Sequence, residues 1–317
     1  PARLGEMLGF DYFTLLDHLT IARSRKHIEK YYGTSETGRF PDRLPPINIK
    51  ADVDRAGEFR SIRDINLEIR RLNLASYAPL RYVLPHKQAA YDAKYSTQIR
   101  GGESFFRQVD REESLIHLLR VNVLKRMESA VSSFTLTVER QLRDVETTLA
   151  RIEASASDIE EIDIADVDID DPAFETLLVG RKVKVLLSDV DLIRWKQDLI
   201  EDRNRLATLL AAAKQVDAAR DAKLAALRNM IEDKCRNPIN AGNRKFIVFT
   251  AFADTAEYLY AQLAPWAKAT LGIESALVTG SGRNQSTLPH LRKDLASILT
   301  AFSPRSKERP ADLADEG

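Results

Sequence analysis

Three cationic side chains lie within four residues of one another near the start of the chain, at Arg23, Arg25 and Lys26. If this stretch is helical, Arg23 and Lys26 share one side of the helix and Arg25 faces elsewhere. Such a cluster is either a solvated helix face or a contact for phosphate groups, which arginine and lysine bind readily in nucleic acids. The residues alone leave both interpretations open.

A second cationic pair, Lys125 and Arg126, lies inside an apolar stretch with helical spacing, Leu118–Phe134. The apolar positions of that stretch are expected to form core, and the two cations are expected to face away from it. From there they could contact either a DNA backbone or the acidic segment that follows in the chain. The two outcomes have opposite consequences, and the sequence does not choose between them.

Other kinds of chemistry are poorly represented. The histidines are scattered, without the His, Cys or Asp spacing of a zinc site, so no metal site is expected. Neither a Gly-x-Ser-x-Gly motif nor a pair of catalytic carboxylates stands out, so no catalytic residue is predicted. We therefore do not expect an independent hydrolase site in this chain.

Composition narrows the class of protein further. The 317 residues carry 47 basic and 47 acidic side chains, so any interaction with nucleic acid must depend on local patches. The single cysteine, Cys235, excludes a disulfide framework and is typical of a reducing cytoplasm. No apolar run approaches the roughly 20 residues that span a bilayer, so a cytoplasmic location without a membrane partner is expected.

Two long rows of apolar residues at helical spacing, which we call seams, occupy the middle of the chain and predict two helices packed as an antiparallel arm. Each helix is expected to have about 40 residues and to span about 60 Å. Between the two helices lies an acidic segment, 157–171, with eight acidic residues and no basic one. The helix that begins at Glu112 has apolar residues at spacings of three and four: Leu124, Met127, Val131, Phe134, Val138, Leu142, Val145, Leu149 and Ile152. The second seam comprises Leu192, Trp195, Leu199, Leu206, Leu209, Ala213, Leu224, Leu227 and Ile231, and Asp202 and Arg220 interrupt it.

A strand–helix–strand pattern follows the arm. The continuous apolar run Phe246–Phe249 predicts a buried strand of the parallel type, and Ser275–Val278 predicts a second strand. Between them a helix is expected over Asp254–Ala269, capped by Asp254 or Thr255. Together these elements predict one βαβ unit, which is too small to bury both faces of its own sheet.

The stretch from Asp221 to Asp254 resembles the opening of the second RecA-like lobe of a superfamily-2 helicase of the Swi/Snf-like branch. Asp221–Leu227 matches the family's D-x-K-L-x-x-L helix, and Phe246–Asp254 is similar to the strand that ends in its fourth motif. Weaker similarities occur, in the family's order, at Arg23–Ile28, Phe40–Arg43, Leu118–Phe134 and Phe302–Arg305. By this analogy Thr250 and Phe252 lie near backbone phosphate, although packing of Phe252 and a simple turn at Thr250 remain equally good interpretations.

The resemblance implies a fragment of an ATP-dependent DNA helicase or translocase. The chain contains no Gly-x-x-x-x-Gly-Lys-Ser/Thr and no Asp-Glu-x-His motif. ATP and Mg²⁺ are therefore expected to bind the parent protein rather than this chain, which alone should not hydrolyse ATP. The implied partners are DNA and the remaining helicase lobes. The alternative is a non-enzymatic helical module whose arm binds a protein partner.

The expected fold is mainly α, a long antiparallel helical arm followed by a partial RecA-like α/β unit. Five parts are expected in chain order: the end of the first lobe or a linker (1–50), a helical connector (51–110), the arm (111–235), the start of the second lobe (236–303) and a disordered tail (304–317).

Overall fold

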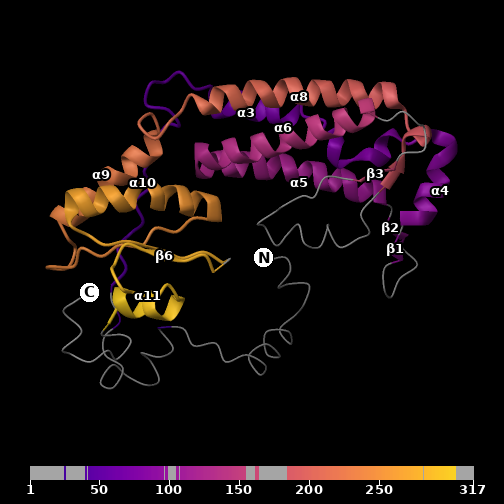
Figure 1. The fold of residues 1–317 in the computed structure, drawn as a ribbon. Coiled ribbons are helices and arrows are strands. Elements are labelled where there is room, and N and C mark those ends of the chain that lie inside the picture. Colours follow the sequence, from indigo (N-terminus) through magenta and orange to yellow (C-terminus); the bar gives the residue numbers. More distant parts are fainter. Residues whose placement is uncertain are drawn as a thin grey trace, which may run out of the picture. The chain divides into compact units, whose positions relative to one another are not determined.

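The computed structural model is mainly helical (Figure 1). It describes Arg25, Phe40 and residues 42–95, 97–98, 105–106, 108–154, 161–163, 184–280 and 282–304. The chain divides into two compact units, Pro1–Lys50 and Ala51–Gly317, and the second contains every named element. The predicted polar tail lies outside the described residues from position 305 onward.

The described helices of the second unit are α3 (Ile62–Arg70), α4 (Pro85–Tyr95), α5 (Gln108–Ser129), α6 (Val131–Ala154), α8 (Leu192–Lys214), α9 (Ala222–Arg236), α10 (Ala253–Leu271) and α11 (Leu295–Phe302). Three 3₁₀ turns lie at Ala75–Tyr77, Pro79–Tyr82 and Leu187–Asp189. The strands form three short antiparallel pairs: β1 (Thr97–Gln98) with β2 (Phe105–Phe106), β3 (Glu161–Asp163) with β4 (Lys184–Leu186), and β5 (Ala276–Leu277) with β6 (Gln285–Ser286). The block of acidic residues at 157–171 predicts a mobile loop, because like charges repel one another, but strand β3 lies within it.

The first long helix of the sequence prediction is in fact two helices, and the chain reverses direction between α5 and α6 (Figure 1). The Ala130 N–H donates to Arg126 O at 2.9 Å, and the Phe134 N–H donates to Ala130 O at 3.1 Å, so one residue ends α5 and begins α6. The serines on both sides of Ala130 have a lower helix propensity than alanine or leucine, which weakens a continuous helix there. The spacing of apolar residues predicted burial correctly but not this reversal.

The second long helix is also divided, because Asp221 begins a new helix. Its carboxylate accepts a hydrogen bond from the Leu224 N–H at 2.9 Å and caps α9, after the turn at residues 215–221. Helices α6 and α8 pack against each other and run antiparallel. Lys214, at the end of α8, forms an ion pair at 2.8 Å with Glu139, near the start of α6, as the antiparallel arrangement requires.

The predicted apolar seams form the core of this helical layer. Most of their side chains are buried, whereas Leu124, Leu142, Leu192 and Leu227 are half-buried. Trp195 is the largest fully buried side chain: its ring stacks on Tyr82 with centroids 5.8 Å apart, and its Nε1–H donates to Ala75 O at 3.0 Å. The seam thus also holds the connector that precedes it in the chain.

The two charged residues that interrupt the second seam each have a tertiary role. Asp202 is completely buried and accepts hydrogen bonds from the Asn73 N–H at 2.6 Å and the Ala75 N–H at 2.9 Å. The residue between them, Leu74, has φ 52°, a left-handed conformation that costs a leucine energy. Asp202 therefore stabilises a strained turn of the connector from the middle of α8.

Arg220, the other interruption, forms a two-pronged ion pair with the buried Asp54. Its Nε–H donates to Asp54 Oδ1 at 3.0 Å and its Nη2–H donates to Asp54 Oδ2 at 2.5 Å. This contact holds the pKa of Asp54 well below its ordinary value. The pair joins the start of the connector to the turn before α9.

The buried Asp202 predicts a pH dependence of stability. Burial raises its pKa to about 6, so the folded state holds the proton more tightly than the unfolded chain does. The stabilisation that the protonated Asp202 carboxyl group gives the folded state is therefore fully present below about pH 4 and is lost as the pH rises toward about 6. We expect about 1–3 kcal/mol of unfolding free energy to be lost across this range, and Asp202→Asn to remove that dependence. Urea unfolding of the native protein and of Asp202→Asn across this pH range tests the prediction. Glu112, whose pKa burial also raises, is unchanged in the variant and contributes equally to both proteins. Equal slopes of unfolding free energy against pH would therefore contradict the role of Asp202.

The C-terminal part departs most from the sequence prediction. Phe246–Phe249 is not a strand; it has no backbone partner among the described residues, and Phe249 is 89% exposed. The described strands β5 and β6 form an antiparallel pair rather than the two parallel strands of a βαβ unit. A strand buried on both faces needs neighbouring strands and covering helices, and the described residues supply neither to this segment.

Two helix starts in this region also differ. Helix α10 begins after Phe252, with no side-chain cap, so neither Asp254 nor Thr255 is its N-cap. Both lie in its first turn instead and are used in tertiary contacts. The amphipathic pattern of Leu288–Phe302 predicts a helix from Leu288, but α11 starts at Leu295 because the Asp294 carboxylate caps it by accepting from the Ser297 N–H at 2.9 Å.

Candidate functional site

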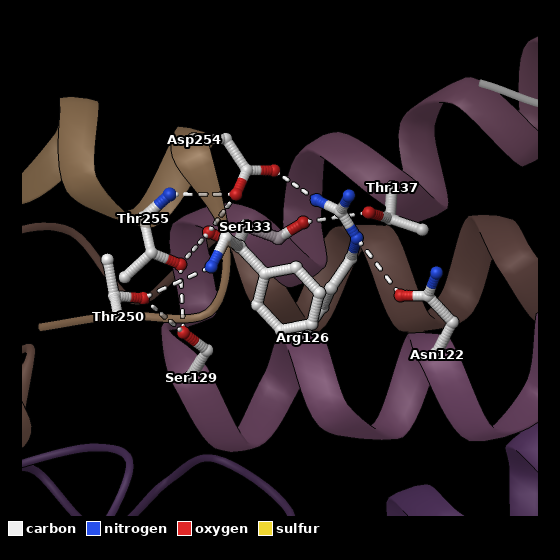
Figure 2. A network of polar contacts seen from close by, with 9 residues as sticks. Asn122, Arg126, Ser129, Ser133, Thr137, Thr250, Asp254 and Thr255 are labelled. Carbon is white, nitrogen blue, oxygen red and sulfur yellow. Dashed lines mark hydrogen bonds and ion pairs between the residues drawn. The ribbon is translucent and has the colours of Figure 1, made fainter. Parts of the chain in front are cut away.

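The first turn of α10 meets the end of the α5–α6 hairpin in a buried polar cluster, which we call the junction (Figure 2). It consists of Asn122, Arg126, Ser129, Ser133, Thr250, Phe252, Asp254 and Thr255. Its central contact is an ion pair between Arg126 Nη1 and Asp254 Oδ2, two residues 128 positions apart. The junction therefore joins the helical arm to the segment that resembles the start of a helicase lobe.

Arg126 is surrounded on several sides. Its side chain is only 6% exposed; its Nε–H donates to Asn122 Oδ1 at 3.2 Å, and its guanidinium lies 4.7 Å from the centre of the Phe252 ring. Asn122 precedes Arg126 by four residues and so lies on the same face of α5. A buried charge needs such partners, because leaving it unpaired in the interior costs several kcal/mol.

Four hydroxyl groups complete the junction on the other side of Asp254. The Ser133 hydroxyl donates to Asp254 Oδ1 at 3.0 Å and lies 2.6 Å from the Thr255 hydroxyl. Ser129 Oγ lies 2.9 Å from the Thr255 Oγ1 and 3.4 Å from the Thr250 Oγ1. Both ends of the hairpin turn are thus bonded to the start of α10, as Figure 2 shows.

Two further contacts hold this region together. The Tyr258 hydroxyl of α10 donates to Asp221 Oδ2, the cap of α9, at 2.8 Å. The Lys223 ammonium donates to the Glu128 carbonyl in the last turn of α5, where a cation is favourable because the final carbonyls lack helical partners. Helices α9 and α10 are therefore both attached to the same end of the hairpin.

The chemistry of the junction is that of a fixed connection. Its only carboxylate, Asp254, is paired with Arg126 and accepts a hydrogen bond from the Ser133 hydroxyl, so it is not positioned as a general base for an incoming substrate. The hydroxyls bond one another rather than a histidine or lysine. Residues in this arrangement hold the end of the hairpin and the start of α10 together.

The structure brings together three of the seven residues predicted to contact nucleic acid. Arg126, Thr250 and Phe252 all belong to the junction, although they come from two distant segments. Contrary to the expectation that Arg126 faces away from the core, its side chain is buried, because Asp254 offers it a charged partner there.

Of the other four predicted residues, the structure describes two, Lys125 and Arg25. Lys125, which precedes Arg126 on α5, is exposed. Arg25 lies with its guanidinium 5.4 Å from the Phe40 ring centre, and Arg23 and Lys26 lie outside the described residues. Sequence reasoning missed the roles of Ser129, Ser133 and Thr255. The only signal was the spacing of four residues between Ser129 and Ser133 within a helical pattern, since the partner segment is remote.

Within the described ranges, no group of three or more His, Cys, Asp and Glu side chains is placed to hold a metal ion. Over the same residues, no helix is long and apolar enough to cross a membrane. The chain matches no protein-family model, no curated protein and no solved structure.

Proposed function

We propose that this chain acts within an ATP-dependent DNA helicase or translocase of the Swi/Snf-like superfamily-2 branch, where it couples a helical arm to the second RecA-like lobe. The observation that carries the proposal is the junction. In it, Phe252 and Asp254, from the segment that resembles the fourth helicase motif, contact Arg126 of the arm. A motor that closes two lobes on DNA needs such a rigid attachment, because a loose one would dissipate the movement.

The exposed segment Phe246–Phe249 supports the same proposal. Its Ile247 is 60% exposed and its Phe249 is 89% exposed, on a segment with unpaired backbone groups. Apolar side chains on both faces are typical of a central strand in a parallel sheet. We propose that further strands of a RecA-like lobe flank it in the parent protein, which would also supply the sites for ATP and Mg²⁺.

A second candidate function, a non-enzymatic module that binds a protein partner along its arm, is favoured by apolar side chains on the outer face of α8. Ile193 is 83% exposed and Ile200 is 41% exposed, and they lie seven residues apart on the same side of the helix. The predicted seams are used within the arm, so these two residues are the apolar surface left for a partner on α8.

Binding of labelled duplex DNA, measured across a salt series, distinguishes the two candidates. For the motor we expect binding that weakens steeply between about 50 and 200 mM salt, because phosphate contacts release counterions. Replacing Arg23, Arg25 and Lys26 with Glu should weaken binding and make the salt slope shallower. No binding at low salt would contradict a DNA contact by this chain and favour the protein-interaction module.

ATP hydrolysis provides an independent check. We expect no detectable turnover by this chain alone, with or without DNA, because it carries neither a phosphate-binding loop nor a metal-binding Asp-Glu motif. Turnover that changes when residues of this chain are mutated would contradict the proposal that nucleotide binding belongs to other parts of the parent protein.

A further inference from the structure

A pocket of about 550 Å³ opens along the first turns of α9, the helix of the D-x-K-L-x-x-L pattern. Its volume lies within the range of about 300–1,000 Å³ that is common for ligand sites. Its lining includes Arg55, Ala219, Ala222, Ala226, Arg228 and Asn229. The function proposed above does not use these residues.

Two arginines of the pocket have no carboxylate partner in the described part of the chain. Arg55 makes one long hydrogen bond, from Nη1 to Ala219 O at 3.5 Å. Arg228 donates from Nη2 to Gln262 O at 3.1 Å and lies 5.6 Å from the centre of the Trp266 ring, while its Nε has no hydrogen-bond partner. Donors of this kind are suited to an acceptor that comes from outside the chain.

The acidic residues around the pocket are already paired with other groups. Asp54 is bonded to Arg220, and Asp221 accepts from Leu224 and Tyr258. Glu232, which also lines the pocket, pairs with Arg236 at 2.9 Å. The charges of Arg55 and Arg228 are therefore not cancelled by direct contacts, and the pocket favours an anion.

Alanines form much of the pocket lining, and their small side chains leave room for a bulky polar group. Ala222, Ala225 and Ala226 lie on one face of α9 at spacings of three and four residues. The backbone amides of the lining residues at the helix start are occupied, since the Ala222 N–H donates to Val53 O at 3.3 Å and the Ala225 N–H donates to Asp221 O at 3.1 Å. Anion binding must therefore come from the two arginine side chains and Asn229.

We propose that this pocket binds a phosphate group, held by Arg55 and Arg228. Guanidinium groups match the geometry of phosphate oxygens, and Asn229 offers a further donor. A nucleic-acid backbone and a free nucleotide share this chemistry; we take the backbone as the source, an assignment that rests on the proposed DNA-dependent motor. The pocket would then add a DNA contact at the α9–α10 side of the junction.

Three variants of the full chain test the pocket: Arg55→Gln, Ala226→Glu, which places a carboxylate in it, and the control Arg203→Gln, an exposed arginine of α8 outside it. We expect Arg55→Gln to reduce the slope of log affinity for duplex DNA against log salt by about 1, as for one lost phosphate contact. Ala226→Glu should weaken binding further, and the control should leave the slope unchanged. Circular dichroism melts verify that each variant is folded.

Two outcomes separate this inference from the proposed function. If the native chain binds DNA and the pocket variants bind it equally well, the pocket assignment is wrong while the motor proposal stands. If the native chain does not bind DNA, inorganic phosphate and ATP become the probes. A thermal stabilisation by either that is lost in Arg55→Gln supports the pocket with a small-molecule source, and no stabilisation overturns it.

Discussion

Replacing Arg126 with Ala should lower the free energy of unfolding by about 3–5 kcal/mol, because it leaves the Asp254 carboxylate without its charged partner. The substitution also removes the stacking on Phe252 and the hydrogen bond to Asn122. Since the junction attaches α10 to the hairpin, we expect a second effect: faster hydrogen exchange of the amides in the first turn of α10. Urea unfolding and hydrogen exchange measure the two effects separately.

The neighbouring Lys125→Ala is a matched control, since Lys125 is exposed and one residue away on the same helix. It should change the unfolding free energy by less than about 0.5 kcal/mol. A double-mutant cycle with Asp254→Ala isolates the pair: the combined loss should be smaller than the sum of the single losses. Additive losses would show that Arg126 and Asp254 do not stabilise each other, and would remove the physical basis of the coupling proposal.

Trp195→Ala should lower the free energy of unfolding by a comparable amount, about 3–5 kcal/mol, because removing a fully buried indole leaves a large cavity in the arm. The ring also stacks on Tyr82, and its N–H satisfies Ala75 O in the connector. The arm should therefore loosen together with the connector. Urea unfolding followed by far-ultraviolet circular dichroism measures the loss.

Two milder substitutions locate the origin of that effect. Trp195→Phe keeps an aromatic ring but loses the N–H, and should cost about 1–3 kcal/mol for the unsatisfied Ala75 carbonyl and the missing volume. Ile193→Ala, two residues away and 83% exposed, should be almost neutral. Equal losses for Trp195→Ala and Ile193→Ala would mean that the seam of α8 is not packed as the structure has it.

The apolar spacing of the chain was sufficient to predict which residues of the arm are buried. Met127, Phe134, Val138 and Leu199 lie in the core as the helical period requires. The same spacing did not predict the reversal of the chain at Ala130 or the break between α8 and α9 before Asp221, because a seam is equally apolar on either side of a turn. Asp202 and Arg220 interrupted the pattern, and each proved to bond a distant segment.

The sequence by itself thus determined the mainly helical class of this protein, the faces of its helices that are buried and the residue types available for binding. It predicted that Arg126 faces away from the core, toward DNA or the acidic segment, because the local pattern does not show which group lies opposite the side chain. Only the tertiary structure decided this, by folding the hairpin so that Asp254 and Ser133 meet at its end. Helical periodicity is a local property, whereas the pairing of two charges 128 residues apart depends on the path of the whole chain between them.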